Sequence, residues 1–156
     1  DGEGLATRRN VLMAGGRLER FVHNSETARR AGTTSTGSAV RGYSSTPGVG
    51  VRAVAVTGGD RPPAELIAAI DDGLLVQGVT GLHSGVNAVS GDFSTGAEGL
   101  RIRGGALAEP VREFTIASTI QKMLLDVSAI GDDVQWLPMR AAGVTLVIGE
   151  LTVSGM

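Results

Sequence analysis

The sequence predicts an α+β fold: a predominantly antiparallel or mixed β-sheet that curls toward a barrel, with about three helices. Glycine makes up 24 of the 156 residues and alternates with Val, Ile and Leu, as in short strands joined by tight turns. Two apolar-rich runs each contain a glycine pair, Gly15-Gly16 and Gly104-Gly105, which suits a two-residue hairpin turn. The regular alternation of strands and helices that is typical of a parallel sheet is absent.

Composition predicts one domain over residues 1–156, long enough to bury a hydrophobic core. The chain has no cysteine, which excludes disulfides and thiolate metal ligands and fits a reducing cytoplasm. No run of about 18 apolar residues occurs, and the first residues do not resemble a signal peptide. We therefore expect a cytoplasmic protein with no contact to a membrane.

The net charge of −2 is unevenly distributed, since residues 1–52 carry eight arginines and four acids while the rest is acidic. This distribution has two interpretations: an arginine-bearing face that meets an acidic partner or a peptide carboxylate, or a solvated mixed surface. Nucleic-acid binding is not expected, because the chain has one lysine, no basic run and no aromatic residues interleaved with basic ones.

In the first third of the chain, residues 24–32 predict a short helix with Asn24 or Ser25 as its N-cap and a glycine at its end. Residues 33–50 are rich in Thr, Ser and Gly without an apolar period, so we expect a long loop there. The sequence "VRAVAVT", residues 51–57, then predicts a strand.

Two further helices are predicted. One begins at Pro62-Pro63, with Asp60 as its cap, and ends at Gly73. The other is capped by Ser118, ends at Gly131 and has the clearest apolar stripe. That stripe consists of Ile120, Met123, Leu124, Val127 and Ile130. The remaining predicted strands form a second hairpin, residues 99–118, and one or two strands at the end of the chain, residues 143–156.

The loop "HSGVNAVSGDFSTGAEG", residues 83–99, is compatible with a phosphate loop, a serine nucleophile or a tight glycine turn. No lysine lies near its glycines, which excludes the usual phosphate loop. A nucleophile elbow requires Gly-x-Ser-x-Gly, whereas Ser84 comes one position late in residues 81–85. In a strand, His83 would point away from Ser84. We therefore expect a glycine-permitted turn that leads into the second hairpin.

Metal and acid–base chemistry have few candidate residues. His23 and His83 are the only histidines, and no His-Glu-x-x-His helix is present, so two histidines and a carboxylate would have to meet through the fold. The acid pairs Asp71-Asp72 and Asp132-Asp133 are interpreted as caps of turns rather than as a general acid and base. Trp136, the single tryptophan, either packs against a partner or covers the edge of the core.

Several segments, in order along essentially the whole chain, resemble the TldD/PmbA family. Residues 85–118, "GVNAVSGDFSTGAEGLRIRGGALAEPVREFTIAS", resemble its C-terminal signature, with the Gly-Asp-Phe-Ser loop at residues 91–94 as the most specific part. Residues 1–32 resemble the segment that follows the metal-binding helix of that family. The pattern is completed by residues 63–76, 129–133 and 146–156.

The resemblance implies the C-terminal domain of a cytoplasmic bacterial peptidase system. In that family a TldD-type subunit carries a His-Glu-x-x-x-His zinc motif and pairs with a PmbA-type (TldE) subunit that lacks it. The heterodimer encloses a cavity and processes unfolded or extended peptides. The family is also known as a modulator of DNA gyrase.

Residues 81–94, "GLHSGVNAVSGDFS", resemble the PmbA side of the family, and two departures from the TldD-type pattern argue against direct zinc catalysis by this chain. The His-Glu-x-x-x-His helix would lie upstream of Asp1, outside this chain. The cysteine that completes the TldD-type zinc site has no counterpart in residues 138–147, where Ala142 precedes Gly143. The resemblance thus implies a partner subunit without its own cofactor, the zinc being held by a TldD-type partner or by an upstream segment.

Two functional hypotheses follow. In the first, the glycine loops shape a peptide-binding cavity, and an exposed strand edge adds a peptide strand through backbone hydrogen bonds. In the second, the chain is a purely structural dimerisation module whose arginine-rich N-terminal part meets an acidic partner, either a TldD-type subunit or a second copy of the chain. The first hypothesis assigns no catalytic or metal-ligating residue and expects substrate to contact His83, Ser84, Asp92, Phe93 and Ser94.

Overall fold

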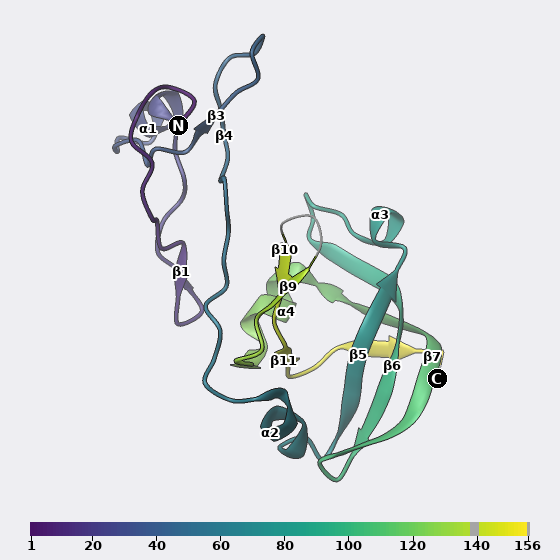
Figure 1. Cartoon of the computed structure of the whole chain (residues 1–156). Coiled ribbons are helices and arrows are strands. Elements are labelled where there is room, and N and C mark those ends of the chain that lie inside the picture. Colours follow the sequence, from purple (N-terminus) through teal and green to yellow (C-terminus); the bar gives the residue numbers. More distant parts are fainter. Residues whose placement is uncertain (138–140, 156) are drawn as a thin grey trace. The chain divides into compact units, whose positions relative to one another are not determined.

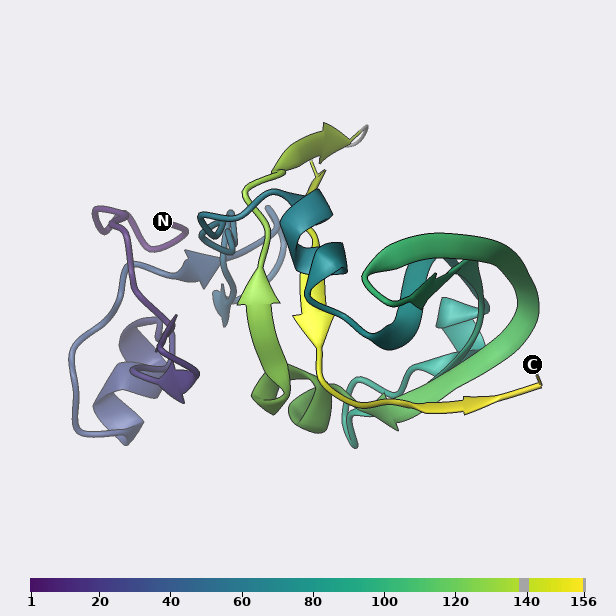
Figure 2. The same cartoon turned by 90° about the horizontal axis from the view of Figure 1, so that it is seen from below.

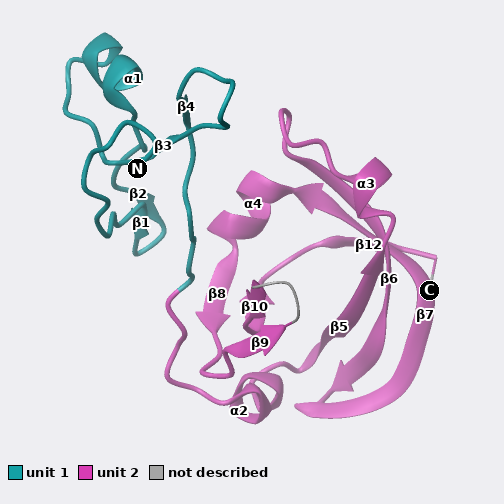
Figure 3. Cartoon of the chain, turned by 45° about the horizontal axis from the view of Figure 1, so that its top comes forward, with its two compact units in different colours: residues 1–56 teal, residues 57–156 magenta. Residues whose placement is uncertain are grey.

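The computed structural model describes residues 1–137 and 141–155, and these form two compact units, Asp1–Val56 and Thr57–Met156 (Figure 3). Each unit has its own strands and helices. The division leaves the expected single domain over residues 1–156 a prediction, because contact density alone does not show whether the units fold independently.

The first unit contains two short hairpins and one helix. Strands β1 (Met13–Ala14) and β2 (Arg17–Leu18) pair in antiparallel fashion around the Gly15-Gly16 turn, whose φ angles are 55° and 75°, so the predicted hairpin is confirmed. Helix α1 (Ser25–Arg30) is confirmed as well. The expected loop of residues 33–50 contains a second antiparallel pair, β3 (Ala39–Val40) with β4 (Gly48–Val49).

Polar side chains hold much of this unit together. Asn24, Thr36 and Ser38 are all buried. The Thr36 hydroxyl accepts a hydrogen bond from the backbone N–H of His23 at 2.7 Å and lies 2.9 Å from the Ser38 hydroxyl. These bonds satisfy the buried polar groups and connect the segment before α1 to the one after it.

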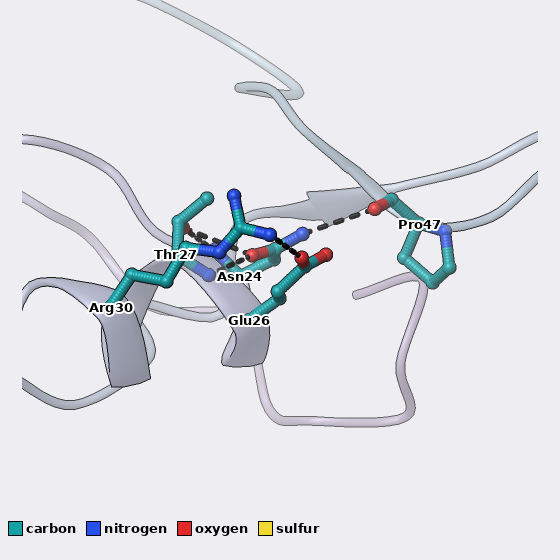
Figure 4. A network of polar contacts seen from close by, with 5 residues as sticks. All are labelled: Asn24, Glu26, Thr27, Arg30 and Pro47. Carbon is teal, nitrogen blue, oxygen red and sulfur yellow. Dashed lines mark hydrogen bonds and ion pairs between the residues drawn. The ribbon is translucent and has the colours of Figure 1, made fainter.

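Asn24 is the N-cap of α1 and forms a capping box (Figure 4). Its Oδ1 accepts from the Thr27 backbone N–H at 2.8 Å, and the Thr27 hydroxyl accepts from the Asn24 N–H at 3.2 Å. The Asn24 side-chain amide also donates to the carbonyl of Pro47 at 3.1 Å. This one side chain therefore begins the helix and ties it to the segment that precedes β4.

We expect Asn24→Ala to lower the free energy of unfolding by about 1–2 kcal/mol, because it removes both the cap and the contact to Pro47. Asn24→Asp keeps the cap acceptor but loses the amide donor, so its loss should be smaller. Urea denaturation followed by circular dichroism measures both. The control is Arg30→Ala, which breaks only the exposed pair with Glu26 (2.6 Å) and should change stability by less than about 0.5 kcal/mol. Equal stability of all three variants would contradict the assignment.

The strand predicted for residues 51–57 is wrong. The segment pairs with no described strand, and Val51, Val54 and Val56 are 44%, 68% and 56% exposed. β-branched residues favour an extended chain, but a strand requires a hydrogen-bonded neighbour.

The second unit is built on a four-stranded antiparallel sheet in the order β12-β7-β6-β5 (Figure 1). Its strands are β5 (Asp72–Thr80), β6 (Asp92–Arg103), β7 (Ala106–Thr119) and β12 (Thr152–Ser154). Outside this sheet, β8 (Val127–Ile130) pairs with β11 (Leu146–Ile148), and β9 (Gln135–Leu137) pairs with β10 (Ala141–Gly143). The helices are α2 (Pro63–Ala68), α3 (Leu82–Gly85) and α4 (Ile120–Leu125).

The α+β class and the antiparallel pairing are confirmed, but the sheet does not close into a barrel among the described residues. Its long strands bend strongly (Figure 2), and the β6–β7 ladder shifts register twice. The sheet nevertheless keeps two edges, β5 and β12, and β12 pairs only with residues 115–117 of β7. Four helices are described rather than about three, because the short helix α3 was not predicted.

The two helices predicted in this unit are present, but neither has its predicted cap and both end early. Helix α2 follows Pro62, without a side-chain cap from Asp60, and ends at Ala68 rather than at Gly73. Helix α4 is capped by the hydroxyl of Thr119 rather than by Ser118, which is the preceding residue in β7, and it stops at Leu125 rather than at Gly131. The last two residues of its predicted apolar stripe, Val127 and Ile130, belong to strand β8 instead, which pairs with β11. The predicted final strands are confirmed as β11 and β12.

The core of this unit lies on one face of the β6–β7 hairpin. Ala97, Phe114 and Ile116 are its buried centre. The partly buried side chains around it are Leu74, Val76, Phe93, Val111 and Val153. Because side chains alternate along a strand, the opposite face of β6 is free for other roles.

Candidate pocket at the start of strand β6

The segment between β5 and β6 forms an open pocket of about 700 Å³ together with the first residues of β6. Its lining residues are Ser84, Gly85, Val86, Asn87, Ala88, Asp92 and Ser94. Three of the five residues expected to contact substrate, namely Ser84, Asp92 and Ser94, therefore lie together. Their role as substrate-binding residues stays a prediction.

The other two expected residues do not line this pocket. Phe93 lies between Asp92 and Ser94 on β6, so the alternation of the strand turns its ring to the core, where it packs. His83 is exposed on α3 beside Ser84. The helical turn replaces the strand that the sequence suggested for this pair.

A network of short-range hydrogen bonds sets the path of the loop. The Asn87 side-chain oxygen accepts from the backbone N–H groups of Val89 (2.9 Å) and Ser90 (3.2 Å). The Asn87 N–H donates to the carbonyl of Asp92 at 2.9 Å, and Gly91 N–H donates to the carbonyl of Asn87 at 2.8 Å. Sequence reasoning missed Asn87, although an asparagine ahead of a glycine turn is a known signal for this geometry.

Two glycines allow close approaches on either side of the pocket. A Cβ atom on Gly85 would lie 2.0 Å from the carbonyl oxygen of Ser94. Gly91 has a φ of 83°, and a Cβ there would lie 2.1 Å from the Gln121 side chain. The predicted tight glycine turn is thus confirmed at Gly91, and it connects β6 to α4 through the bond from Ile120 N–H to the Gly91 carbonyl (2.8 Å).

We expect Gly85→Ala to destabilise the chain by about 1–3 kcal/mol, because the new methyl group meets a backbone carbonyl that cannot move without shifting β6. Urea denaturation measures the loss. Gly149→Ala is the matched control, since its Cβ would meet its nearest neighbour, the Asp126 carbonyl oxygen, at an ordinary 3.6 Å. If both variants had wild-type stability, α3 would not pack on β6 in this way.

One carboxylate of each acid pair accepts hydrogen bonds from another segment of the chain. Asp72 accepts two hydrogen bonds from the guanidinium of Arg101 across the β5–β6 pair, at 2.6 and 2.8 Å. Asp133 accepts from the hydroxyl of Thr145 at 2.7 Å and from its backbone N–H at 3.1 Å. The hydroxyl bond holds the pKa of Asp133 below its ordinary value of 3.8.

A carboxyl group whose pKa is lowered by folding stabilises the fold above its ordinary pKa, and this contribution disappears as the pH falls through the lowered value. We expect Thr145→Val to raise the pKa of Asp133 toward 3.8, because the main donor is lost. Thr145→Ser retains a hydroxyl and should keep the pKa low. Titration of the carboxyl carbon by NMR distinguishes them, and an identical Asp133 pKa in both variants would show that the hydroxyl bond does not lower it.

Zinc ligands are not grouped in this chain. Within residues 1–137 and 141–155, no three His, Asp or Glu side chains lie close enough together to hold a metal ion. His23 belongs to the first unit, where its Nδ1 lies 3.2 Å from the Thr27 hydroxyl, and His83 belongs to the second. These residues do not fit a zinc site. In the segment compared with the TldD-type cysteine, Ala142 is in β10, and residues 138–140 lie outside the described residues.

Two other surfaces bear on the sequence predictions. Trp136 on β9 is 77% exposed, beside the half-exposed Leu137, so it does not cover a core edge. In the first unit, Arg8 and Arg20 line a hollow of about 460 Å³ together with Glu19 and His23, within the arginine-rich part of the sequence.

Among the residues described, no helix has the length and apolar character needed to span a membrane.

Residues 1–155 match the family described as the PmbA/TldA metallopeptidase C-terminal domain. The chain belongs to the TldD/PmbA family. The resemblance noted in the sequence is therefore confirmed, and two of the four Gly-Asp-Phe-Ser residues that carried it, Asp92 and Ser94, line the pocket.

Known proteins of the TldD/PmbA family are similar to this chain in sequence and in fold. The metalloprotease PmbA homolog of Haemophilus influenzae is 31% identical over 157 residues, which cover 99% of this chain and 32% of that protein. The crystal structure of TldE from Thermococcus kodakarensis matches 98% of this chain and 35% of its own, with a TM-score of 0.79 and 30% identity. A Thermotoga maritima protein proposed to modulate DNA gyrase matches 99% of this chain and 35% of its own, with a TM-score of 0.81 and 27% identity. The chain thus spans about a third of the length of these relatives.

Proposed function

We propose that this chain is the C-terminal part of a cytoplasmic PmbA/TldE-type subunit that shapes a peptide-binding surface for proteolysis by a TldD-type partner. The observation that carries the proposal is a free strand edge that runs to an open pocket. Strand β5 is the outer strand of the main sheet, and α3, which lines the pocket, follows it directly.

A free edge binds an extended chain through backbone groups alone. No described strand pairs with the outer side of β5, so its outward N–H and C=O groups are available to a peptide. Such pairing requires no particular side chain in the ligand. It therefore suits a system that accepts many unfolded peptides.

The chemical step belongs to the partner in this proposal. The described residues of this chain do not fit a zinc site, and the similarity to TldE supports the partner-type assignment. The zinc is then held by the TldD-type subunit or by an upstream segment. Peptide is the expected ligand, and nucleic acid and membrane are not.

An exposed aromatic side chain also favours a role in assembly, because Trp136 is 77% exposed and tryptophan is enriched in protein interfaces. We propose the exposed β9 residues Trp136 and Leu137 as part of the contact with the TldD-type subunit.

Hydrogen exchange of the full chain with an extended peptide tests the peptide-binding role. We expect the outward amides of β5 to exchange about tenfold more slowly at a peptide concentration near ten times Kd, while those within the β6–β7 ladder stay unchanged. A peptide with N-methylated backbone amides is the control, because it cannot pair with a strand edge.

The same preparation separates the two hypotheses. If the chain co-purifies with a TldD-type subunit but peptide does not slow amide exchange in β5, the peptide-binding hypothesis is excluded. The hypothesis of a purely structural dimerisation module then remains. Protection of β5 by the N-methylated peptide would contradict strand addition.

A further inference from the structure

The pocket at the start of β6 has a one-sided charge. Among the seven lining residues that the structure describes, Asp92 is the only charged one, and none is basic. The unit that contains the pocket is acidic in composition, since residues 57–156 contain twelve acidic and six basic side chains. An acidic environment raises the local concentration of cations and repels carboxylates.

Several oxygen atoms of the lining residues can accept further hydrogen bonds. Asp92 Oδ2 accepts from the Ser90 hydroxyl at 2.7 Å, while Asp92 Oδ1 has no hydrogen bond or ion pair to any described residue. The Ser84 hydroxyl donates to the Gly81 carbonyl at 3.2 Å, which leaves its lone pairs open. The side chain of Ser94 adds a third oxygen to the lining.

A protonated amine complements such a set of atoms. An ammonium group has three donors and no acceptor, so it can bond to a carboxylate oxygen and to hydroxyl oxygens at once. A peptide carboxylate would meet the charge of Asp92 instead.

The pocket is also organised before a ligand arrives. The hydroxyl of Ser90 orients Asp92, the side chain of Asn87 fixes the turn, and Gly85 lies against the Ser94 carbonyl. Binding then requires little further ordering of this loop.

We infer that this pocket binds a protonated amine of the peptide, and that Asp92 is the residue that selects it. The amine is either the α-amino group or a lysine side chain. The inference rests on the proposed peptide-binding function and deepens it, because it adds a charge preference to a backbone contact that has none.

Three peptides, labelled at the C-terminus, test this inference with the full chain. The first has a free α-amine and no lysine, and the second is the same sequence with its α-amine acetylated. The third is the second peptide with one residue replaced by lysine. Fluorescence anisotropy gives Kd for each. We expect acetylation to weaken binding about three- to fivefold, the range of an exposed ion pair, if the α-amine is bound. If a lysine side chain is bound, the third peptide should bind about three- to fivefold more tightly than the second.

Asp92→Asn keeps the size of the side chain and removes its charge, so it should make the three affinities equal. Asp60→Asn is the matched control, an exposed carboxylate away from the pocket that should leave the preference intact. The comparison of the three peptides uses only the wild-type chain. It therefore tests the amine preference even if Asp92→Asn fails to fold. Equal affinities in the wild type, or a preference that survives in Asp92→Asn, would overturn the inference and leave peptide binding in place. Absence of binding by all three peptides would overturn the proposed function itself.

Discussion

The antiparallel pairing of β6 with β7 sets which side chains enter the core and which reach the pocket. The two strands turn at Gly104-Gly105, with φ angles of 54° and 76°. A Cβ on Gly105 would lie 2.6 Å from the Ala68 carbonyl oxygen, so a side chain there would displace backbone. Because residues alternate between faces, a slip of one residue would exchange Phe93 for Asp92 in the core. The pocket and the core therefore depend on one register.

The two units differ in charge as well as in construction. Residues 1–56 contain eight arginines and four acids, and they are held mainly by buried polar groups such as Asn24 and Thr36. Residues 57–156 are acidic and have an apolar centre at Phe114. The arginine-rich part of the sequence thus forms a unit of its own, and the pocket proposed to bind an amine belongs to the acidic unit.

Features that depend on neighbouring residues were predictable. The Gly15-Gly16 and Gly104-Gly105 turns and the Asn24 cap need only local backbone geometry, and all three are present. Two predictions that depended on a distant partner strand failed, in opposite directions. Residues 51–57 have strand-forming residues but no partner strand, whereas Val127–Ile130 fitted a helical stripe and became a strand because β11 lies beside it. The same reason explains the open sheet, since closure would require β5 to pair with β12.

The sequence alone determined the family, the α+β class and the glycine turns, because these depend on local residue patterns. Tertiary structure decided the rest. It brought Ser84 and Asn87 to Asp92 and Ser94, turned Phe93 into the core and left one oxygen of Asp92 free. The physical reason is that a pocket consists of side chains from separate segments. Their meeting depends on strand register and helix packing, which no single stretch of sequence contains.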